Sequence, residues 1–396
     1  MSSSVPWRAI AAIAAGVLVV TLSFQLPKSS DSAQNTDGQQ ISSASDGAVI
    51  AGARDSVTAP PIGQPAKDIP LPLPGEKPKQ VVVISIDGGC ETSGGVATDL
   101  LDVAQTIQAR ITFFITGLCL LPDQQRNAYN PPNRPRGSSD LPFADAAMVE
   151  RRVEVFDRMY REGHEIATHF LGHFCGPSGV GTWNSADWDS ELTQSRKFLD
   201  NWAKYNPQAA SAPTLSFDSS VFTGSRTPCL EGDRSQMHRS FAEAGFRYEA
   251  SDPGALQWPR KHEKSDLWLF PLPAIKLAGT EKWVLSMDYN LLVNQNDGEV
   301  NGSKETCQRV EEQTYDTMMM ALEGVYEGNR APLVIGSHLN DWLCSAYVKS
   351  LHRFLKDAAE KYPDVDFVSF QDLADWLDKM PKNVLSELQE LEAQRY

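Results

Sequence analysis

Residues 81–89 read VVVISIDGG, an apolar run that stops at one carboxylate followed by two glycines. An uninterrupted apolar run bounded by a turn signal is typical of a parallel strand that is buried on both faces. Glycine tolerates the backbone conformations of a tight turn, so the chain can leave the strand sharply after Asp87. We therefore expect a buried strand that presents Asp87 at its carboxyl end.

Strands and helices alternate from this point onward. Further strand-like runs occupy residues 112–115, 165–168, 221–225, 247–250, 267–270, 284–287, 332–337 and 365–369. Helical stretches lie among them at residues 146–161, 188–205, 236–244, 305–326 and 347–361. Repeated β-α units over about 300 residues predict a parallel sheet, which we expect to close as a barrel.

In barrels of this kind the working residues gather at the carboxyl ends of the strands. Five polar residues fall at or just after predicted strand ends: Asp87, His169, Arg226, Asp288 and His338. We therefore expect these five side chains to face a common site.

The segment GHEIATHFLGH at residues 163–173 separates His169 from His173 by three residues. On a helix, side chains four positions apart share one face, and imidazole suits zinc, iron, copper or nickel better than calcium or magnesium. The metalloprotease signature H-E-x-x-H does not fit, because His164 and His169 are five positions apart and point about 140° away from each other on a helix. We expect His169 and His173 to bind a metal ion; two ordinary, partly buried histidines are the alternative.

Composition limits the classes of partner. The 396 residues suffice for one large or two modest domains, and 41% hydrophobic residues with nine tryptophans can form a core. The net charge of −15 argues against a nucleic-acid partner, because nucleic-acid binders present basic patches. We expect a substrate that is neutral or cationic, or a polymer held by aromatic stacking.

The first 28 residues resemble an export or anchoring signal, with Arg8 before an apolar run at residues 9–24 and Lys28 after it. The run is shorter than the ~20 residues of a full membrane span, and no good A-x-A cleavage site follows, so a signal peptide and an uncleaved anchor both stay open. Residues 29–79 are rich first in serine and glutamine and then in proline, which predicts a linker. We place the body of the protein, a domain at residues 80–380 with a helical tail at 381–396, outside the cytoplasm.

Six cysteines lie at positions 90, 119, 175, 229, 307 and 344, all within the predicted domain. An even number of cysteines in an exported protein suggests disulfides. No two of them have CxxC spacing, which excludes a zinc finger.

Five short motifs follow one another along this domain. They are SIDGG at residues 85–89, TFFITG at 112–117, HFLGH at 169–173, RTPC at 226–229 and LVIGSH at 333–338. In this order they resemble the motifs of the polysaccharide deacetylases with a NodB homology domain, carbohydrate esterase family 4. The resemblance covers residues 80–378 and implies a distorted (β/α) barrel. Asp288 after an apolar strand and HLNDW at 338–342 are similar to the insect chitin deacetylase branch.

The resemblance implies a metal-dependent hydrolase that removes acetyl groups from an extracellular polysaccharide. A divalent metal, with Zn2+ the expected ion, would be held by His169 and His173 and would polarise the acetamide carbonyl and activate a water. By resemblance Asp87 is the base, and Arg226 orients it. His338 would be the general acid.

Several further expectations complete this interpretation. Asp288 would keep His338 protonated, and Trp342 would stack on a sugar ring, with core packing as its alternative. Cys175 and Cys229 each follow a catalytic motif on loops that should be neighbours, so we expect a disulfide between them. The insertion at residues 120–144 would overhang the active face. We expect a monomer that acts on chitin-like or peptidoglycan chains, with O-acetylated xylan still open.

One departure from the family pattern concerns the metal. The second aspartate of the first motif, the usual third metal ligand, is Gly88 here. The metal would then bind through two histidines and water, or Asp87 would itself become a ligand. The alternative function is a degenerate member that binds glycan without hydrolysing it, and a lectin-like structural protein without metal is a third possibility.

Overall fold

The computed structural model describes residues 67–209 and 214–396. The expected signal or anchor at residues 1–28, and the linker up to residue 66, lie outside the described residues. Within the described ranges, no helix has both the length and the apolar character needed to cross a membrane.

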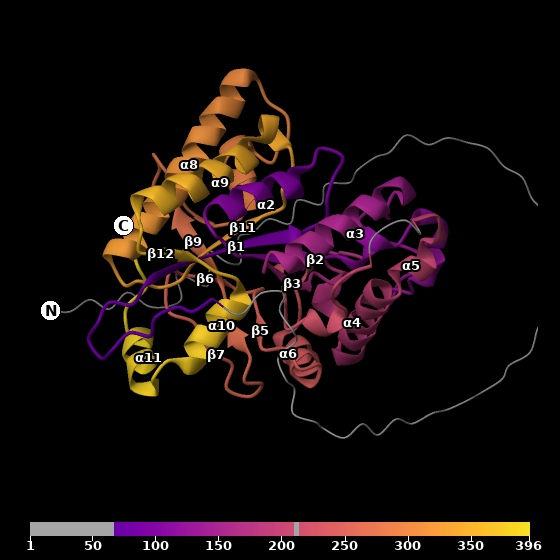
Figure 1. Cartoon of the computed structure of the whole chain (residues 1–396), viewed down its shortest axis with the longest axis horizontal. Coiled ribbons are helices and arrows are strands. Elements are labelled where there is room, and N and C mark those ends of the chain that lie inside the picture. The colour runs from indigo at the N-terminus through magenta and orange to yellow at the C-terminus, as the bar shows by residue number, and fades with distance from the viewer. Residues whose placement is uncertain (1–66, 210–213) are drawn as a thin grey trace, which may run out of the picture. The chain divides into compact units, whose positions relative to one another are not determined.

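One curled sheet dominates the domain (Figure 1). Its strands are β1 (Gln80–Gly88), β2 (Ile111–Ile115), β3 (Glu165–Thr168), β4 (Gly224–Ser225), β5 (Tyr248–Glu249), β7 (Arg260–Lys261), β8 (Trp268–Leu269), β11 (Leu333–Ser337) and β12 (Val365–Phe367). Their order is β11-β1-β2-β3-β4-β5-β8-β7, and β12 also pairs with β1. All pairs are parallel except β7 with β8. The parallel pairing brings the carboxyl ends of β1, β2, β3, β4 and β11 to one edge.

The expected distorted (β/α) barrel is confirmed, although the sheet does not close by hydrogen bonding. In the described part of the chain, no ladder joins the terminal strands β7 and β11. A separate three-stranded sheet of β6 (Pro253–Gly254), β9 (Leu272–Lys276) and β10 (Trp283–Leu285) adjoins β11 through a bridge between Met287 and Gly336. This small sheet, which the sequence analysis did not anticipate, brings the segment after β10 next to the end of β11.

Helices surround the sheet. They are α2 (Val96–Thr106), α3 (Ala146–Arg161), α4 (Ser185–Asp200), α5 (Trp202–Tyr205), α6 (Arg234–Glu243), α7 (Asp288–Asn296), α8 (Lys304–Glu327), α9 (Trp342–Lys361), α10 (Phe370–Lys379) and α11 (Lys382–Gln389). Short 3-10 turns occupy Gly117–Leu120, Asp123–Ala128, Val180–Thr182, Pro207–Ala209, Ser219–Val221 and Pro228–Leu230. Capping side chains fix several helix starts: Asp145 before α3, and the capping boxes Asn184–Asp187 of α4 and Ser369–Asp372 of α10.

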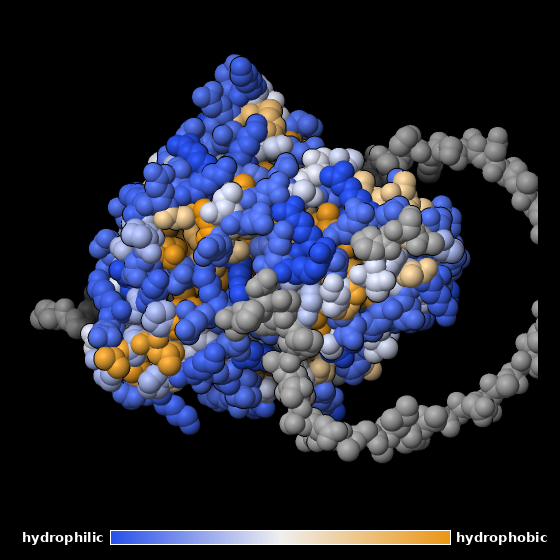
Figure 2. Space-filling model, viewed as in Figure 1, coloured by the Kyte–Doolittle hydropathy of each residue, from blue (hydrophilic) through white to orange (hydrophobic). Residues whose placement is uncertain are grey.

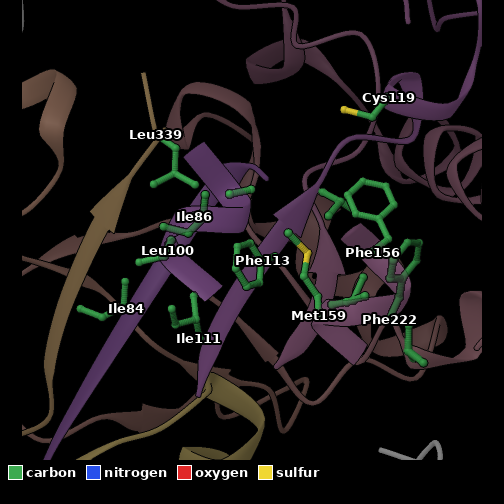
Figure 3. Close-up of a cluster of buried hydrophobic side chains, with 14 of the residues drawn as sticks. Ile84, Ile86, Leu100, Ile111, Phe113, Cys119, Phe156, Met159, Phe222 and Leu339 are labelled. Carbon is green, nitrogen blue, oxygen red and sulfur yellow. The ribbon is translucent and has the colours of Figure 1, made fainter. Parts of the chain in front are cut away.

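The side chains of β1 alternate between two of the three core clusters of the described domain. Val82, Ile84 and Ile86 pack into the larger cluster with residues of α2, α3 and α9, part of which Figure 3 shows. Val81 and Val83 point to the opposite face and join a second cluster that includes residues of α10. Successive side chains of a strand face opposite ways, so Ser85 and Asp87 continue the line of Val81 and Val83. The inner face of β1 thus becomes polar only at its carboxyl end.

Residues 67–79, which the sequence analysis assigned to the linker, contact the domain. The Lys67 amide donates to Asp372 Oδ1 at 2.9 Å, and Trp376 Nε1 donates to the Pro70 carbonyl at 3.1 Å. Ile69 is buried. The domain therefore starts before the predicted boundary at residue 80. The visible face of the molecule is predominantly hydrophilic, with small apolar areas (Figure 2).

Three disulfides join the six cysteines. Cys175 pairs with Cys229, as predicted. Cys90 pairs with Cys119, and Cys307 pairs with Cys344. The first two bridges connect segments that follow different strands, and the third connects the start of α8 to the start of α9.

Candidate active site

Asp87 forms a buried ion pair with Arg226 at the carboxyl end of β1. Arg226 Nη1 lies 2.8 Å from Asp87 Oδ1, and Asp87 is 5% exposed. Burial by itself would raise the pKa of Asp87, but Arg226 together with His169 and His338 lowers it below its ordinary value. Asp87 is therefore a carboxylate at neutral pH, although little water reaches it.

Arg226 is fixed from several sides. Its Nε donates to the Ala250 carbonyl at 2.9 Å, and its Nη1 also donates to Ser85 Oγ at 2.8 Å. Its guanidinium lies over the Phe114 ring, 4.7 Å from the centroid, a favourable cation–π geometry. Ser85 is a site residue that the sequence analysis passed over. Its signal was a hydroxyl on the inner face of β1, two positions before Asp87.

His169 and His173 lie on the loop after β3, with their ring centroids 5.2 Å apart. The prediction that they come together is met, but the helical reason for it was wrong. The loop instead contains left-handed residues, with φ of 59° at Phe170 and 54° at His173. Such values are uncommon outside glycine, and here they turn both imidazoles to the same side.

The two imidazoles have the chemistry of metal ligands. His169 Nδ1 lies 2.8 Å from the Arg226 carbonyl oxygen; a carbonyl only accepts, so Nδ1 carries the proton and Nε2 keeps a free lone pair. Burial, with help from His169 and His338, lowers the pKa of His173 to about 3. Both rings are thus neutral in the pH range where metals bind, and a divalent ion fits this pair.

A second group near His173 does not offer metal ligands in this state. His173 Nδ1 lies 3.5 Å from Cys175 Sγ and 3.9 Å from Cys229 Sγ. These sulfurs are joined to each other as a disulfide. Because thiolate is the form of cysteine that binds metals, the bridge supports His173 rather than completing a site.

Gly88 leaves room where the family pattern has its third ligand. Its φ is +80°, and a Cβ built there would meet nothing within 4 Å. There is space for a side chain at this position, although a φ of +80° would strain any residue with a Cβ, and among the described residues no other group fills the space.

His338 forms the second charged pair of the site, with Asp288. His338 Nδ1 lies 2.6 Å from Asp288 Oδ1, while the backbone amide of His338 and the Ser337 hydroxyl both donate to Oδ2. Burial would lower the pKa of His338, but Asp288 outweighs it and raises the pKa to about 9. His338 is therefore a cation at neutral pH with its Nε2–H free to donate. Asp288 opens α7, a helix absent from the sequence prediction.

Trp342 lies beside His338, with 6.1 Å between the ring centroids. It is partly buried and packs against the core cluster that contains Leu291, Leu343 and Tyr347. The core packing considered for Trp342 is therefore present, and stacking on a sugar ring stays a prediction. The other aromatic neighbour of Trp342 is Tyr289, at 6.2 Å.

The insertion at residues 120–144 lies against the loop that carries His169 and His173, and its expected position over the active face stays a prediction. The Asp140 amide donates to the Gly172 carbonyl at 2.9 Å, and Arg134 donates to the Ser178 carbonyl at 3.0 Å. Tyr129, fully buried, donates its hydroxyl to Glu191 of α4. The insertion thus braces the segment that carries His169 and His173.

Part of the chain matches a known protein family. Residues 74–227 match the family model described as polysaccharide deacetylase. No curated protein matches the sequence.

Solved structures similar to this chain include a Mycobacterium smegmatis protein assigned as a polysaccharide deacetylase, with 15% identity, a TM-score of 0.46 and coverage of 83% of this chain and 97% of that one. The chitin deacetylase of the fungal pathogen Colletotrichum lindemuthianum has 16% identity and a TM-score of 0.37, with 76% and 87% covered. A Puue allantoinase has 14% identity and a TM-score of 0.42, with 83% and 97% covered.

Proposed function

We propose, on the premise that this chain belongs to the polysaccharide deacetylase family, that it is a metal-dependent hydrolase of acetyl groups on an extracellular polysaccharide. N-acetylglucosamine units of chitin-like or peptidoglycan chains are the proposed substrate. A net charge of −15 is compatible with an uncharged polymer, and the partly buried ring of Trp342 beside His338 could contact a sugar.

His169 and His173 would hold the metal, for which Zn2+ is the proposed identity because both ligands are neutral imidazoles. When bound, the ion supplies Lewis acidity that polarises the acyl carbonyl and favours ionisation of water. The remaining steps depend on the protein's own side chains.

Asp87 accepts the proton of the attacking water in this proposal. Arg226 donates to Asp87 Oδ1 and keeps this carboxyl group ionised. A base must be ionised before it can accept a proton. The ion pair also prevents the carboxylate from rotating freely, so its other oxygen has a fixed direction.

His338 donates a proton to the departing nitrogen. An amine leaves poorly as an anion, so the reaction needs an acid that is still protonated when the C–N bond breaks. Asp288 holds the proton on His338 through the 2.6 Å contact with Nδ1, which leaves Nε2–H as the donor.

The observation that carries the proposal is that the two ion pairs shift pKa values in opposite directions. Arg226 lowers the pKa of the carboxyl group that must accept a proton, and Asp288 raises the pKa of the imidazole that must donate one. Pairs of titratable groups whose pKa values are driven apart are typical of acid–base catalysis. A module that only binds glycan has no need of them.

Gly88 is the observation that favours the alternative, a degenerate member that binds glycan without hydrolysing it. Without the usual third ligand, the proposed site has one carboxylate ligand fewer and should bind the metal more weakly. The two functions separate in a single experiment: metal content of the purified protein, measured beside acetate release from acetylated chito-oligosaccharides, peptidoglycan and acetylxylan.

Acetate release that depends on bound metal, and that is lost in Asp87→Asn, would support the hydrolase. Glycan binding without acetate release, in protein saturated with Zn2+, would support the alternative. We also propose an extracytoplasmic location, since three disulfides need an oxidising compartment, with the first 28 residues as signal or anchor, and a monomer.

A further inference from the structure

Exposed apolar side chains gather beside the proposed acid. In the described ranges the large hydrophobic residues that stay exposed are Leu71, Leu73, Tyr289, Val293, Val300 and Leu391. Three of these, Tyr289 at 41%, Val293 at 42% and Val300 at 40%, belong to α7 or to the loop that follows it. Tyr289 and Val293 are four positions apart and share one face of the helix. Gathered apolar exposure of this kind marks a binding surface more often than chance.

Tyr289 and Trp342 together form what we call the aromatic corner. Their ring centroids are 6.2 Å apart at an interplanar angle of 60°, and Trp342 is in turn 6.1 Å from His338. The Tyr289 amide donates to Asp288 Oδ1 at 2.7 Å. The same carboxylate that holds the proton on His338 therefore also fixes the start of the helix that carries Tyr289.

The backbone under Trp342 is constrained. Leu343, Cys344 and Ser345 all have positive φ, at 49°, 61° and 63°. Such conformations cost energy in residues other than glycine and persist only where the surroundings hold them. Here the Leu343 amide donates to the Val300 carbonyl at 2.8 Å, Leu343 is buried, and Cys344 is bonded to Cys307 of α8. The molecule maintains this turn, and the turn sets the position of Trp342.

We propose that the aromatic corner binds the sugar ring that neighbours the acetylated unit on the side of the leaving nitrogen. This inference rests on the proposed function. His338 must reach the departing nitrogen, so the reacting ring lies next to His338, and its neighbour in the chain extends over Trp342 toward Tyr289. Pyranose rings carry apolar C–H faces that pack on aromatic rings, and no charge is required of them. The corner would therefore make the enzyme favour polymers over short substrates.

Tyr289→Ala tests the inference with two substrates. On 4-nitrophenyl acetate, which has no sugar ring, the variant should keep the wild-type kcat/KM. On the hexamer of N-acetylglucosamine its kcat/KM should fall by about 2- to 10-fold, the range of one aromatic contact. Tyr289→Phe should retain the wild-type value, because the ring and not the hydroxyl makes the contact. The same assay on acetylated xylohexaose shows whether the corner also accepts xylan chains.

Leu391→Ala is the matched control. Leu391 is 45% exposed but lies near Gly75 and Arg330, at the end of the molecule where β1 and β11 begin. This variant should leave both substrates unaffected. Equal melting temperatures for all variants would show that the loss is local.

Hexamer binding, measured by calorimetry, separates this inference from the proposed function. If no substrate releases acetate but Tyr289→Ala still weakens hexamer binding, the hydrolase proposal fails and the corner stands. If acetate is released and Tyr289→Ala leaves both hexamer affinity and kcat/KM unchanged, the corner fails alone. A variant that alters sedimentation of the protein but not glycan binding would assign the surface to a protein partner and overturn the inference.

Discussion

Two competing roles are proposed for the single carboxylate of Asp87. As a base it must stay off the metal, and as a substitute for the missing aspartate it would have to touch it. The 2.8 Å contact with Arg226 favours the base, because a carboxylate already held by a guanidinium is less available to a cation. We expect Asp87→Asn to retain most of the bound metal and to lose activity by ~10² to 10⁴, the usual contribution of a general base.

Metal content by mass spectrometry and acetate release decide this prediction. Loss of metal in Asp87→Asn would make Asp87 the ligand, and the base would have to be sought elsewhere. Gly88→Asp is the companion variant. It should tighten metal binding, since nothing occupies the space of its side chain and aspartate tolerates positive φ better than most residues.

His169→Ala and His173→Ala should each abolish metal loading and activity while the protein stays folded. The metal site is a small part of a domain with a large core, so its loss removes chemistry rather than structure. His164→Ala is the matched control: His164 is as buried as His169, but its Nδ1 accepts from the Ile111 amide at 3.1 Å. This control should lower stability and keep the metal. Unchanged metal content in both site variants would contradict the assignment.

We expect the His338–Asp288 pair to set the alkaline limit of activity. Asp288 raises the pKa of His338 to about 9, so the acid is lost, and kcat/KM falls, as pH rises through that value. Asp288→Asn should move this limit down toward about 6.5, the ordinary value for histidine. A pH profile of both proteins measures the shift. A limit that stays in place would mean that another group is the acid.

The same pair contributes to stability in a defined pH window. A histidine whose folded pKa lies above its unfolded value stabilises the protein below the unfolded value. That contribution disappears as pH rises through the folded value of about 9.

At the scale of elements, the loops that carry His173 and Arg226 are tied by the Cys175–Cys229 bridge. Replacing both cysteines with serine should lower the free energy of unfolding by ~2 to 4 kcal/mol, as measured by urea denaturation. It should also weaken metal binding, because the bridge lies 3.5 Å from His173 Nδ1. The Cys307→Ser/Cys344→Ser pair is the control and should lower stability without affecting metal affinity. Equal metal affinities in the two double variants would show that the Cys175–Cys229 bridge does not support the metal site.

Several elements could be predicted from the sequence because local patterns determined them. The helix at residues 146–161 and the strand at residues 165–168 have the predicted bounds, since the helix begins at an aspartate cap and the strand is a short strand-like run, EIAT. Helix α7 was missed because its sequence is weakly amphipathic. The strand predicted at residues 221–225 is a 3-10 turn and a two-residue strand. Its place depends on pairing with β3 and β5, which no local pattern reveals.

The residues of the candidate site were likewise only partly predictable from the sequence. Motif order was enough to bring Asp87, His169, Arg226 and His338 into one group, because parallel strands end at a common edge. The left-handed turns at His173 and at Leu343 could not be anticipated, since they depend on tertiary contacts. Tyr289 gave no signal of its own, because its role appears only once α7 is placed beside Trp342.

At the scale of the whole molecule, stability and catalysis should separate. Three disulfides and three core clusters hold the described domain, and a bound metal would add only its binding free energy to the folded state. Treatment with a chelator should abolish acetate release and leave a cooperative thermal transition only slightly lower. Zn2+ should restore activity. Unfolding on chelation would show that the metal is structural.

The pairing of the cysteines has a consequence for how the protein is made. Six cysteines allow 15 connectivities, yet each bridge here joins a cysteine to the next one in the chain. If the chain is exported from its N-terminus, as proposed above, every cysteine of a pair meets its native partner before any later cysteine emerges. Oxidation in step with translocation requires no reshuffling, whereas refolding the complete reduced chain offers all the wrong partners at once. Recombinant yield should accordingly depend on co-translational export far more than on a disulfide isomerase.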